Sequence, residues 1–436
     1  MSQCFKSPRL VVSGMKKFVR SCAMVGIGLA CLSAAAKAQE DRVLFPGDAV
    51  TTGFAGITQT DKPLPVDANP LDHFYIDLDG ASAQIVSLRG LGASPEGQRI
   101  APIVTRQITA RRIGQVFATA IDDEDVPNIF LGATSAYGLQ IVGPDADGNG
   151  APDRLRRGAP GAQFMAGQFG ATTVEGIGEA AEPDVAVDRV PGPGTIWKID
   201  GRTGEPSVFA TLPGNTAPGI GDLVWDGRSS SLYVSDLENG LIHRLDREGI
   251  AQSIFDHGLE GRVAGNFDPI VDDGVRADIT SDAFDSENPD TWGFTQIHRR
   301  VHGLAIHAGR LYYAVAGEKR VWSIGIDKNG DFAGRARIEL DLGNLEMDGP
   351  VTDIAFDLKG MMYLAQRGAP KGSYSYAEFA APGQSGVMRF RAESPDDPAT
   401  PARWIPAAET YAIGLPSPYL ASTGGLALGY GYGEDG

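Results

Sequence analysis

One short segment places several oxygen-bearing side chains at regular spacing. Asp145-Ala-Asp147-Gly-Asn149-Gly-Ala-Pro-Asp153 carries a carboxylate or an amide at every second position from 145 to 149, and a further carboxylate at 153. Oxygen ligands at alternate positions can turn toward one centre, and glycines permit the tight path of a loop that wraps a hard cation. The segment therefore predicts a calcium site made by Asp145, Asp147, Asn149 and Asp153. A plain solvated Asp-Gly loop is the alternative.

The same segment resembles the Asp-rich calcium loops of thrombospondin type 3 repeats and of related exported bacterial modules. It departs from an EF-hand, because Arg156 stands where the bidentate glutamate would be. The resemblance implies calcium as the bound ion.

Motifs of hydrolytic enzymes are missing from the sequence. It contains no HExxH and no GxSxG motif, and the glycine-rich stretch 167–178 lacks the strand–turn–helix context of a phosphate loop. With six histidines and no nucleophile motif, hydrolytic catalysis has little support.

The elements that position the loop are expected to be short strands. Residues 222–257 contain four apolar or alternating runs separated by turn residues. These runs are Leu223–Trp225, Leu232–Ser235, Leu241–Leu245 and Gln252–Phe255. Asn239-Gly240 is the strongest turn signal and predicts an exposed hairpin with a two-residue type I′ turn. Four antiparallel strands in about 40 residues is the size of one propeller blade.

Similar blades follow one another along the chain. The expected inner strands share a small or apolar core, mostly followed by Asp and a turn: TAIDDED, LVWDG, LAIHAG and IAFDLKG. A first blade is expected from Thr51–Ile57, His73–Leu78, Gln84–Leu88 and Pro102–Thr109. The apolar residues show no sustained 3.6-residue period, so helix should be minor. The sequence predicts an all-β fold, a β-propeller of five or six four-stranded blades.

Two insertions interrupt the pattern within the expected propeller domain, residues 39–436. The first, at about 143–194, is rich in Gly, Pro, Asp and Ala and is expected to be a surface excursion. The second, at about 258–301, carries an acidic cluster that we expect to be a solvated loop. The C-terminal GGLALGYGYGEDG looks like another inner strand. Either it closes the ring by pairing with the N-terminal blade, or the chain is truncated before a further blade.

The repeat LYVSDLENGLIHRLD, over Leu232–Asp246, resembles the NHL-repeat and senescence marker protein/gluconolactonase type of propeller. The resemblance is weaker over Leu311–Asp327 and Met361–Phe390 and absent from both insertions. It implies a fold much more strongly than an activity.

Lactonases of that superfamily hold one divalent cation in the central channel with Glu, Asn and Asp side chains. The resemblance places Asp222, His302 and Asp353 nearest to those positions, with Ala118 where a fourth ligand would be. The alternative is structural: Asp222 and Asp353 would bond backbone amides at strand starts, and His302 would be an ordinary residue of the channel mouth.

The chain opens with a segment typical of export. Met15-Lys-Lys-Phe-Val-Arg is a basic stretch, Ala23–Ala36 is apolar, and Ala36-Lys37-Ala38 matches the small-x-small pattern before a cleavage site. Residues 1–38 are therefore expected to be a signal peptide. The apolar run is shorter than the roughly 20 residues that a bilayer requires, so no transmembrane segment is expected in the mature chain.

Cleavage at this point would set the composition of the mature protein. All three cysteines, Cys4, Cys22 and Cys31, lie in the segment to be removed, which excludes cysteine nucleophiles, zinc-thiolate sites and c-type haem. Six basic and no acidic residues leave with it, so the formal charge falls from −17 to −23. Such a surface makes nucleic acid an unsuitable partner.

These observations together predict an exported, periplasmic or extracellular, non-catalytic propeller. It would act as a binding scaffold for a protein or carbohydrate ligand and hold calcium in its Asp-rich loop. A metal-dependent lactone hydrolase of the gluconolactonase type is the alternative. A metal with three or more protein ligands in the axial channel would favour the hydrolase.

Overall fold

The computed structural model describes residues 42–89, 102–170, 190–343, 349–383, 385–393, 400–407, 411, 413 and 420–429. The expected signal peptide lies outside them. Short antiparallel strands dominate, and the helices are brief, such as α2 (Ala110–Ile113) and α3 (Arg262–Ala264). No helix in this part of the chain is long and apolar enough to span a membrane.

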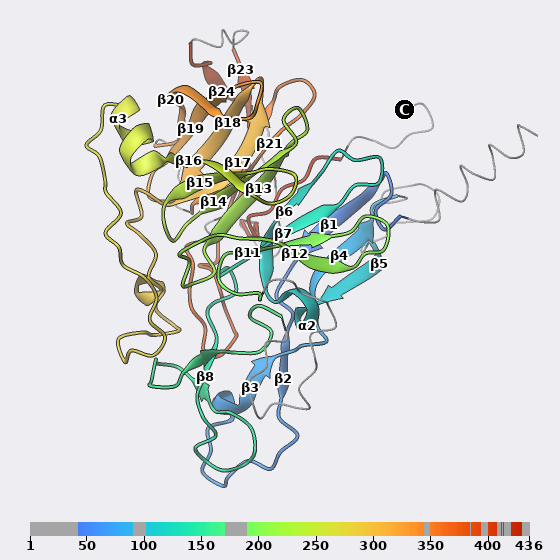
Figure 1. Cartoon of the computed structure of the whole chain (residues 1–436), viewed down its shortest axis with the longest axis vertical. Coiled ribbons are helices and arrows are strands. Elements are labelled where there is room, and N and C mark those ends of the chain that lie inside the picture. Colours follow the sequence, from blue (N-terminus) through green and yellow to red (C-terminus); the bar gives the residue numbers. More distant parts are fainter. Residues whose placement is uncertain are drawn as a thin grey trace, which may run out of the picture.

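Four antiparallel sheets of four strands make up most of the molecule (Figure 1). The first contains β6 (Val116–Ile121), β7 (Ile129–Ala133), β11 (Thr195–Ile199) and β12 (Pro206–Thr211). The second contains β13 (Ile220–Asp226), β14 (Ser231–Asp236), β15 (Leu241–Leu245) and β16 (Ala251–Asp256). The third contains β17 (Val301–His307), β18 (Arg310–Val315), β19 (Arg320–Ile326) and β20 (Phe332–Asp341). The fourth contains β21 (Val351–Phe356), β22 (Met362–Gln366), β23 (Val387–Ala392) and β24 (Trp404–Pro406).

The hydrophobic core lies between neighbouring sheets. Phe130, Ile220 and Leu232 pack between the first and second sheets. Clusters containing Trp322 and Trp404 fill the next two interfaces in the same way. The first strands of successive sheets, β6, β13, β17 and β21, contact one another in that order. Radially arranged four-stranded sheets with their first strands inside are the blades of a β-propeller, so the predicted all-β propeller class is confirmed. Four sheets of four strands are described, and the number of five or six blades stays a prediction.

Buried carboxylates connect successive inner strands. Asp222, at the start of β13, accepts the backbone N–H of Leu223 with one oxygen (2.8 Å) and that of Leu304 in β17 with the other (2.7 Å). Asp353, in β21, accepts the N–H of Leu426 in the same way (2.7 Å). Gly425-Leu426 thus lies beside β21, where the next inner strand would be. Gly303-Leu304 of β17 lies beside β13 in the same way.

The N-terminal sheet has three strands and differs from the expected first blade. It contains β1 (Asp48–Thr52), β4 (Ala81–Ser87) and β5 (Ile103–Thr109). The expected strand His73–Leu78 instead forms β3 (Phe74–Ile76), which pairs with β2 (Ile57–Gln59) outside this sheet. Pro63, Pro65 and Pro70 separate β2 from β3, and each removes a backbone donor that a regular ladder would need. Tyr75 and Ile76 are buried in a different cluster, with Val142 and Met165.

Parts of the two insertions pack together below the blades as a lower lobe, whereas α3 and η2 (His257–Gly261), at the start of the second insertion, contact β20 (Figure 1). The lobe contains η1 (Pro70–His73), η3 (Pro289–Thr291), β8 (Ile141–Val142), β9 (Arg154–Leu155) and β10 (Gln163–Phe164). The Gly158 N–H donates to the Phe284 carbonyl (3.0 Å), and the Ser286 N–H donates to that of Arg156 (2.9 Å). Phe284 and Trp292 are almost fully buried beside Ile141.

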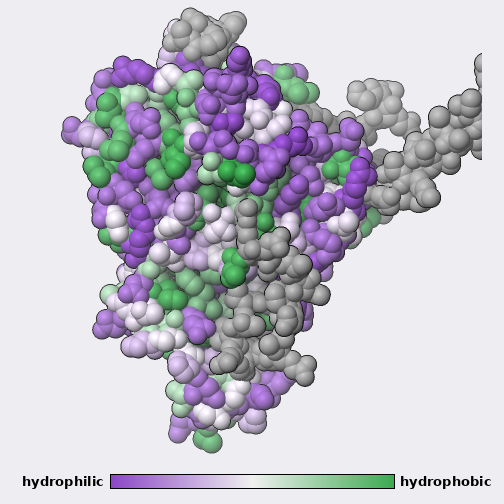
Figure 2. All heavy atoms as spheres, viewed as in Figure 1, coloured by the Kyte–Doolittle hydropathy of each residue, from purple (hydrophilic) through white to green (hydrophobic). Residues whose placement is uncertain are grey.

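The insertions are thus more than surface loops, because apolar residues of both share one core. The acidic cluster of the second insertion is mostly exposed or partly exposed, as predicted. Asp285 is the buried exception, and it pairs with Arg157 (3.1 Å). Figure 2 shows a visible face that is mostly hydrophilic, with scattered apolar residues.

The turn at Asn239-Gly240 is neither exposed nor of type I′. Asp236 pairs with Leu241, which leaves a four-residue loop, and only Gly240 in it has a positive φ (71°). The Gly240 N–H donates to the Asp236 carbonyl, and the Asn239 amide donates to the Asp236 carboxylate (2.6 Å). Arg299, which is 2% exposed, covers the loop and donates to the Asn239 carbonyl (3.0 Å).

We expect Gly240→Ala to destabilise the protein more than Gly214→Ala. Both glycines have positive φ, so each substitution should cost on the order of 1–3 kcal/mol through backbone strain. A Cβ at 240 would also lie 2.8 Å from the Arg299 carbonyl oxygen, whereas a Cβ at 214 meets nothing within 4 Å. Chemical denaturation of both variants measures the difference. Equal losses of unfolding free energy would show that Arg299 moves aside.

We also expect Asp353 to make stability depend on pH. Burial deep in the molecule raises the pKa of Asp353 from its usual 3.8 to about 7. Between these values the folded protein keeps a proton that the unfolded chain has released, so raising the pH through this window should lower the unfolding free energy. Asp353→Asn should flatten this dependence in denaturation curves measured from pH 4 to 7. An unchanged slope in the variant would assign the pH dependence to another group, such as Asp222, whose pKa is also raised by burial and by the charge of Asp353.

Candidate functional site

Asp145 closes the Asp-rich loop with its own carboxylate. One oxygen accepts the N–H groups of Gly148 (2.7 Å) and Asn149 (3.1 Å), and the other accepts that of Gly150 (2.7 Å). These backbone donors, that of Gly150 foremost, lower the pKa of Asp145, so the group is ionised at neutral pH. Gly148 and Gly150 have φ values of 73° and 87°, which glycine adopts without strain.

Two other carboxylates of the loop converge with a buried histidine. Ligand atoms of His73, Asp147 and Asp153 all lie within 4.8 Å of one another. The His73 Nε2 atom is 3.5 Å from an Asp147 oxygen, and the Asn149 amide nitrogen is 3.4 Å from Nδ1 of the same ring. His73 is buried, Asp153 is half-buried and Asp147 is exposed, so the centre opens to solvent. It lies in a shallow depression that Asp72 and Tyr374 also line.

The loop therefore brings together only part of the predicted ligand set. The carboxylates of Asp147 and Asp153 lie close together, whereas that of Asp145 accepts hydrogen bonds from the loop backbone. Asn149 contacts Asp147 and His73 through its amide nitrogen, not its oxygen. His73 was absent from the sequence prediction. It ends η1, far from the loop in sequence, and no local spacing links the two segments.

The electrostatic field at this loop is negative. Burial, followed by the charges of Asp153, Asp147 and Asp145, raises the pKa of Tyr75 to about 12. Within the described residues, none of these three carboxylates pairs with a lysine or an arginine. The donor set has two carboxylates and one imidazole. Carboxylate oxygens suit calcium, and the imidazole adds a ligand that transition metals also accept.

The three channel candidates do not form a common metal centre. Both oxygens of Asp222 accept backbone amides, and Asp353 accepts the Leu426 amide. In the described parts of the chain, the group of His73, Asp147 and Asp153 alone meets the geometry of three clustered ligands. Ala118, at the fourth position, is buried in the core between the first two blades.

His302 instead lines a cavity at the inner ends of the blades. The cavity has a volume of about 180 Å³, and residues of the second insertion, including Trp292, Phe294 and Arg300, form part of its wall. Burial, followed by the charge of Arg367, lowers the pKa of His302 to about 3. His302 is therefore neutral at physiological pH. No local pattern in the sequence indicates that the second insertion reaches this point.

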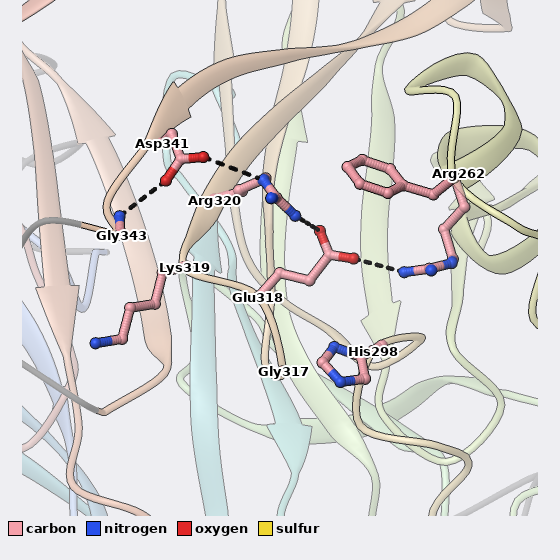
Figure 3. Close-up of a pocket in the computed structure, with 9 residues that line it drawn as sticks. Arg262, His298, Gly317, Glu318, Lys319, Arg320, Asp341 and Gly343 are labelled. Carbon is pink, nitrogen blue, oxygen red and sulfur yellow. Dashed lines mark hydrogen bonds and ion pairs between the residues drawn. The ribbon is translucent and has the colours of Figure 1, made fainter.

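A separate groove near α3 contains a chain of ion pairs (Figure 3). Glu318 contacts Arg262 (2.7 Å) and Arg320 (3.5 Å), and Arg320 also contacts Asp341 (3.4 Å). The opposite charges largely neutralise one another. This arrangement fastens α3 to the strands beside it and offers little net charge to a ligand.

Comparisons with known proteins give structural likeness alone. No family model and no curated protein matches the chain. A protein of unknown function from Bacteroides thetaiotaomicron is 12% identical, with a TM-score of 0.32, over 70% of this chain and 55% of that one. A chain of a nidogen/laminin complex is 11% identical, with a TM-score of 0.34, over 79% of this chain and 84% of that one.

Two other solved structures are also similar to this chain. Regucalcin from Agrobacterium tumefaciens, described as a calcium-binding protein, is 13% identical, with a TM-score of 0.27, over 48% of this chain and 65% of that one. A putative glucose dehydrogenase from Thermus thermophilus is 14% identical, with a TM-score of 0.28, over 70% of this chain and 90% of that one. The β-propeller fold is what this chain shares with them.

Proposed function

We propose that this protein is a non-catalytic binding propeller that holds a calcium ion in its Asp-rich loop. The observation that carries the proposal is the convergence of Asp147, Asp153 and His73 within 4.8 Å, on a lobe outside the blades. The loop is already folded by Asp145, so a cation would complete a pre-formed site. Neighbouring carboxylates without a cation repel one another, and calcium would relieve that repulsion.

The lactonase alternative has less support from the channel. A catalytic cation there would need carboxylate oxygens that are free to coordinate it. Asp222 has both oxygens on backbone amides. Arg367 lies close enough to influence His302, and its positive charge would oppose a divalent cation beside that ring.

Export to the periplasm or the cell exterior belongs to the same proposal. It rests on the basic and apolar segments before residue 39 and on the absence of cysteine after Cys31. Calcium reaches millimolar concentrations outside cells, where weak sites can be filled. A protein or carbohydrate ligand remains the expected partner of the blades and the lower lobe.

We expect calcium to bind the full chain with a dissociation constant of about 0.1–1 mM, as in extracellular modules. Asp147→Asn should abolish the heat of binding in calorimetry, because it removes one of two converging carboxylates. Asp327→Asn is the matched control: Asp327 accepts the N–H groups of Asn329 and Asp331 in a similar turn, outside any cluster of metal ligands described here.

The control variant should bind calcium as the unmodified protein does. Calcium binding that survives Asp147→Asn would place the ion elsewhere. A full chain that gives no heat at millimolar calcium would leave the segment as a solvated loop.

A further inference from the structure

The cavity at the inner ends of the blades has mostly apolar walls. Phe117 and Ile220 come from inner strands, and Trp292, Phe294 and Ile297 come from the second insertion. Trp292 is 1% exposed, so its ring is held firmly in place. The volume of about 180 Å³ is below the roughly 300–1,000 Å³ of pockets that take drug-sized ligands. The cavity therefore suits a small molecule with an apolar body.

Two guanidinium groups interrupt this apolar lining. Arg300 donates to the carbonyls of Thr295 and Phe294, and Arg367 donates to that of Ala136. Among the residues that the structure describes, no carboxylate lies within ion-pair distance of either arginine, and no acceptor contacts Nη1 of Arg300 or Nε and Nη1 of Arg367. Both side chains are half-buried, so these donors are only partly hydrated.

Aromatic rings hold Arg367 in place. Its guanidinium carbon lies 5.5 Å from the centre of the Phe117 ring and 5.6 Å from that of Tyr137. Arg300 lies over Phe294 at 5.7 Å. These contacts orient each fork before a ligand arrives, which reduces the entropy that binding must overcome. Burial lowers the pKa of both arginines, yet arginine stays protonated in proteins.

Two guanidinium groups without an ion-pair partner among the described residues make a cavity that attracts an anion and repels a metal ion. The charges of Asp290 and Asp273 act on Arg300 from beyond ion-pair distance. A carboxylate has two oxygens, and each can accept a charge-assisted hydrogen bond from a nitrogen that remains available, Nη1 of Arg300 and Nε or Nη1 of Arg367. The apolar walls would cover the remainder of such a molecule, whereas inorganic phosphate would leave them empty. The hydroxyl-bearing residues Thr134, Ser135 and Thr352 also line the cavity and offer further donors.

We propose that this axial cavity is a binding site for a small organic carboxylate, with Arg300 and Arg367 holding the carboxylate and Trp292 covering its apolar body. The site is distinct from the Asp-rich loop, and neither depends on the other. It also gives the second insertion a role, since Trp292 and Arg300 both belong to it.

Calorimetry of the full chain with benzoate as the probe tests the proposal. Benzoate should bind with a dissociation constant of about 1 mM or lower. Benzamide, which has the same shape without the charge, and inorganic phosphate, which has charge without an apolar body, should each bind at least about tenfold more weakly. Failure of benzoate to bind, or equal binding of benzamide or phosphate, would overturn the proposal.

Substitutions locate the site. Arg300→Gln and Arg367→Gln should each weaken benzoate binding by about tenfold or more, because each removes a charge-assisted donor. Arg247→Gln is the matched control, since Arg247 is 59% exposed and pairs with Glu124 on the surface. If Arg367→Gln does not fold, Arg367→Lys takes its place in the test. This variant keeps the charge but loses the planar guanidinium group, so it should bind benzoate with intermediate affinity.

Unchanged benzoate affinity in Arg300→Gln would contradict the assignment. Asp147→Asn should bind benzoate normally, so failure of the calcium proposal can be told apart from failure of this one.

Discussion

Buried carboxylates fasten successive inner strands of the propeller to one another. Asp222 joins β13 to β17 through the Leu304 amide, and Asp353 joins β21 to the following segment through the Leu426 amide. Removing such a carboxylate from water is costly, and the backbone donors offset that cost. The strands are thereby fixed around a narrow axis. The same bonds occupy the carboxylates that a metal in the channel would need. The mouth of the channel is therefore better suited to a ligand other than a metal ion.

The insertions place functional groups where the blades alone could not. One contributes the loop with Asp147 and Asp153, which meets His73 of η1. The other brings Trp292 and Arg300 to the inner ends of the blades. Their shared core, which includes Phe284, keeps both in position. The lower lobe is thus a second hydrophobic unit that carries one candidate site and completes another.

Much of the blade structure was predictable, because it follows from local patterns. The second blade, β13 to β16, has strands and turns in the predicted places, since each hairpin connects neighbouring residues. The predicted turn type at Asn239-Gly240 was wrong, because the last pair of the two strands is Asp236 with Leu241. This register leaves four residues in the loop instead of two. His73 could not be found, since its contact with the loop spans distant segments. That Arg300 and Arg367 have no ion-pair partner among the described residues is equally invisible in a sequence, because it depends on the distances between segments in the fold.

A crystal structure of the full chain grown with calcium would show whether the Asp-rich loop holds the ion. We expect electron density for one ion among His73, Asp147 and Asp153, with oxygen ligands at about 2.3–2.6 Å. Asp222 and Asp353 should keep their backbone partners. An ion in the axial channel bound by Asp222, His302 and Asp353, with the loop empty, would contradict the account and favour a metal-dependent hydrolase.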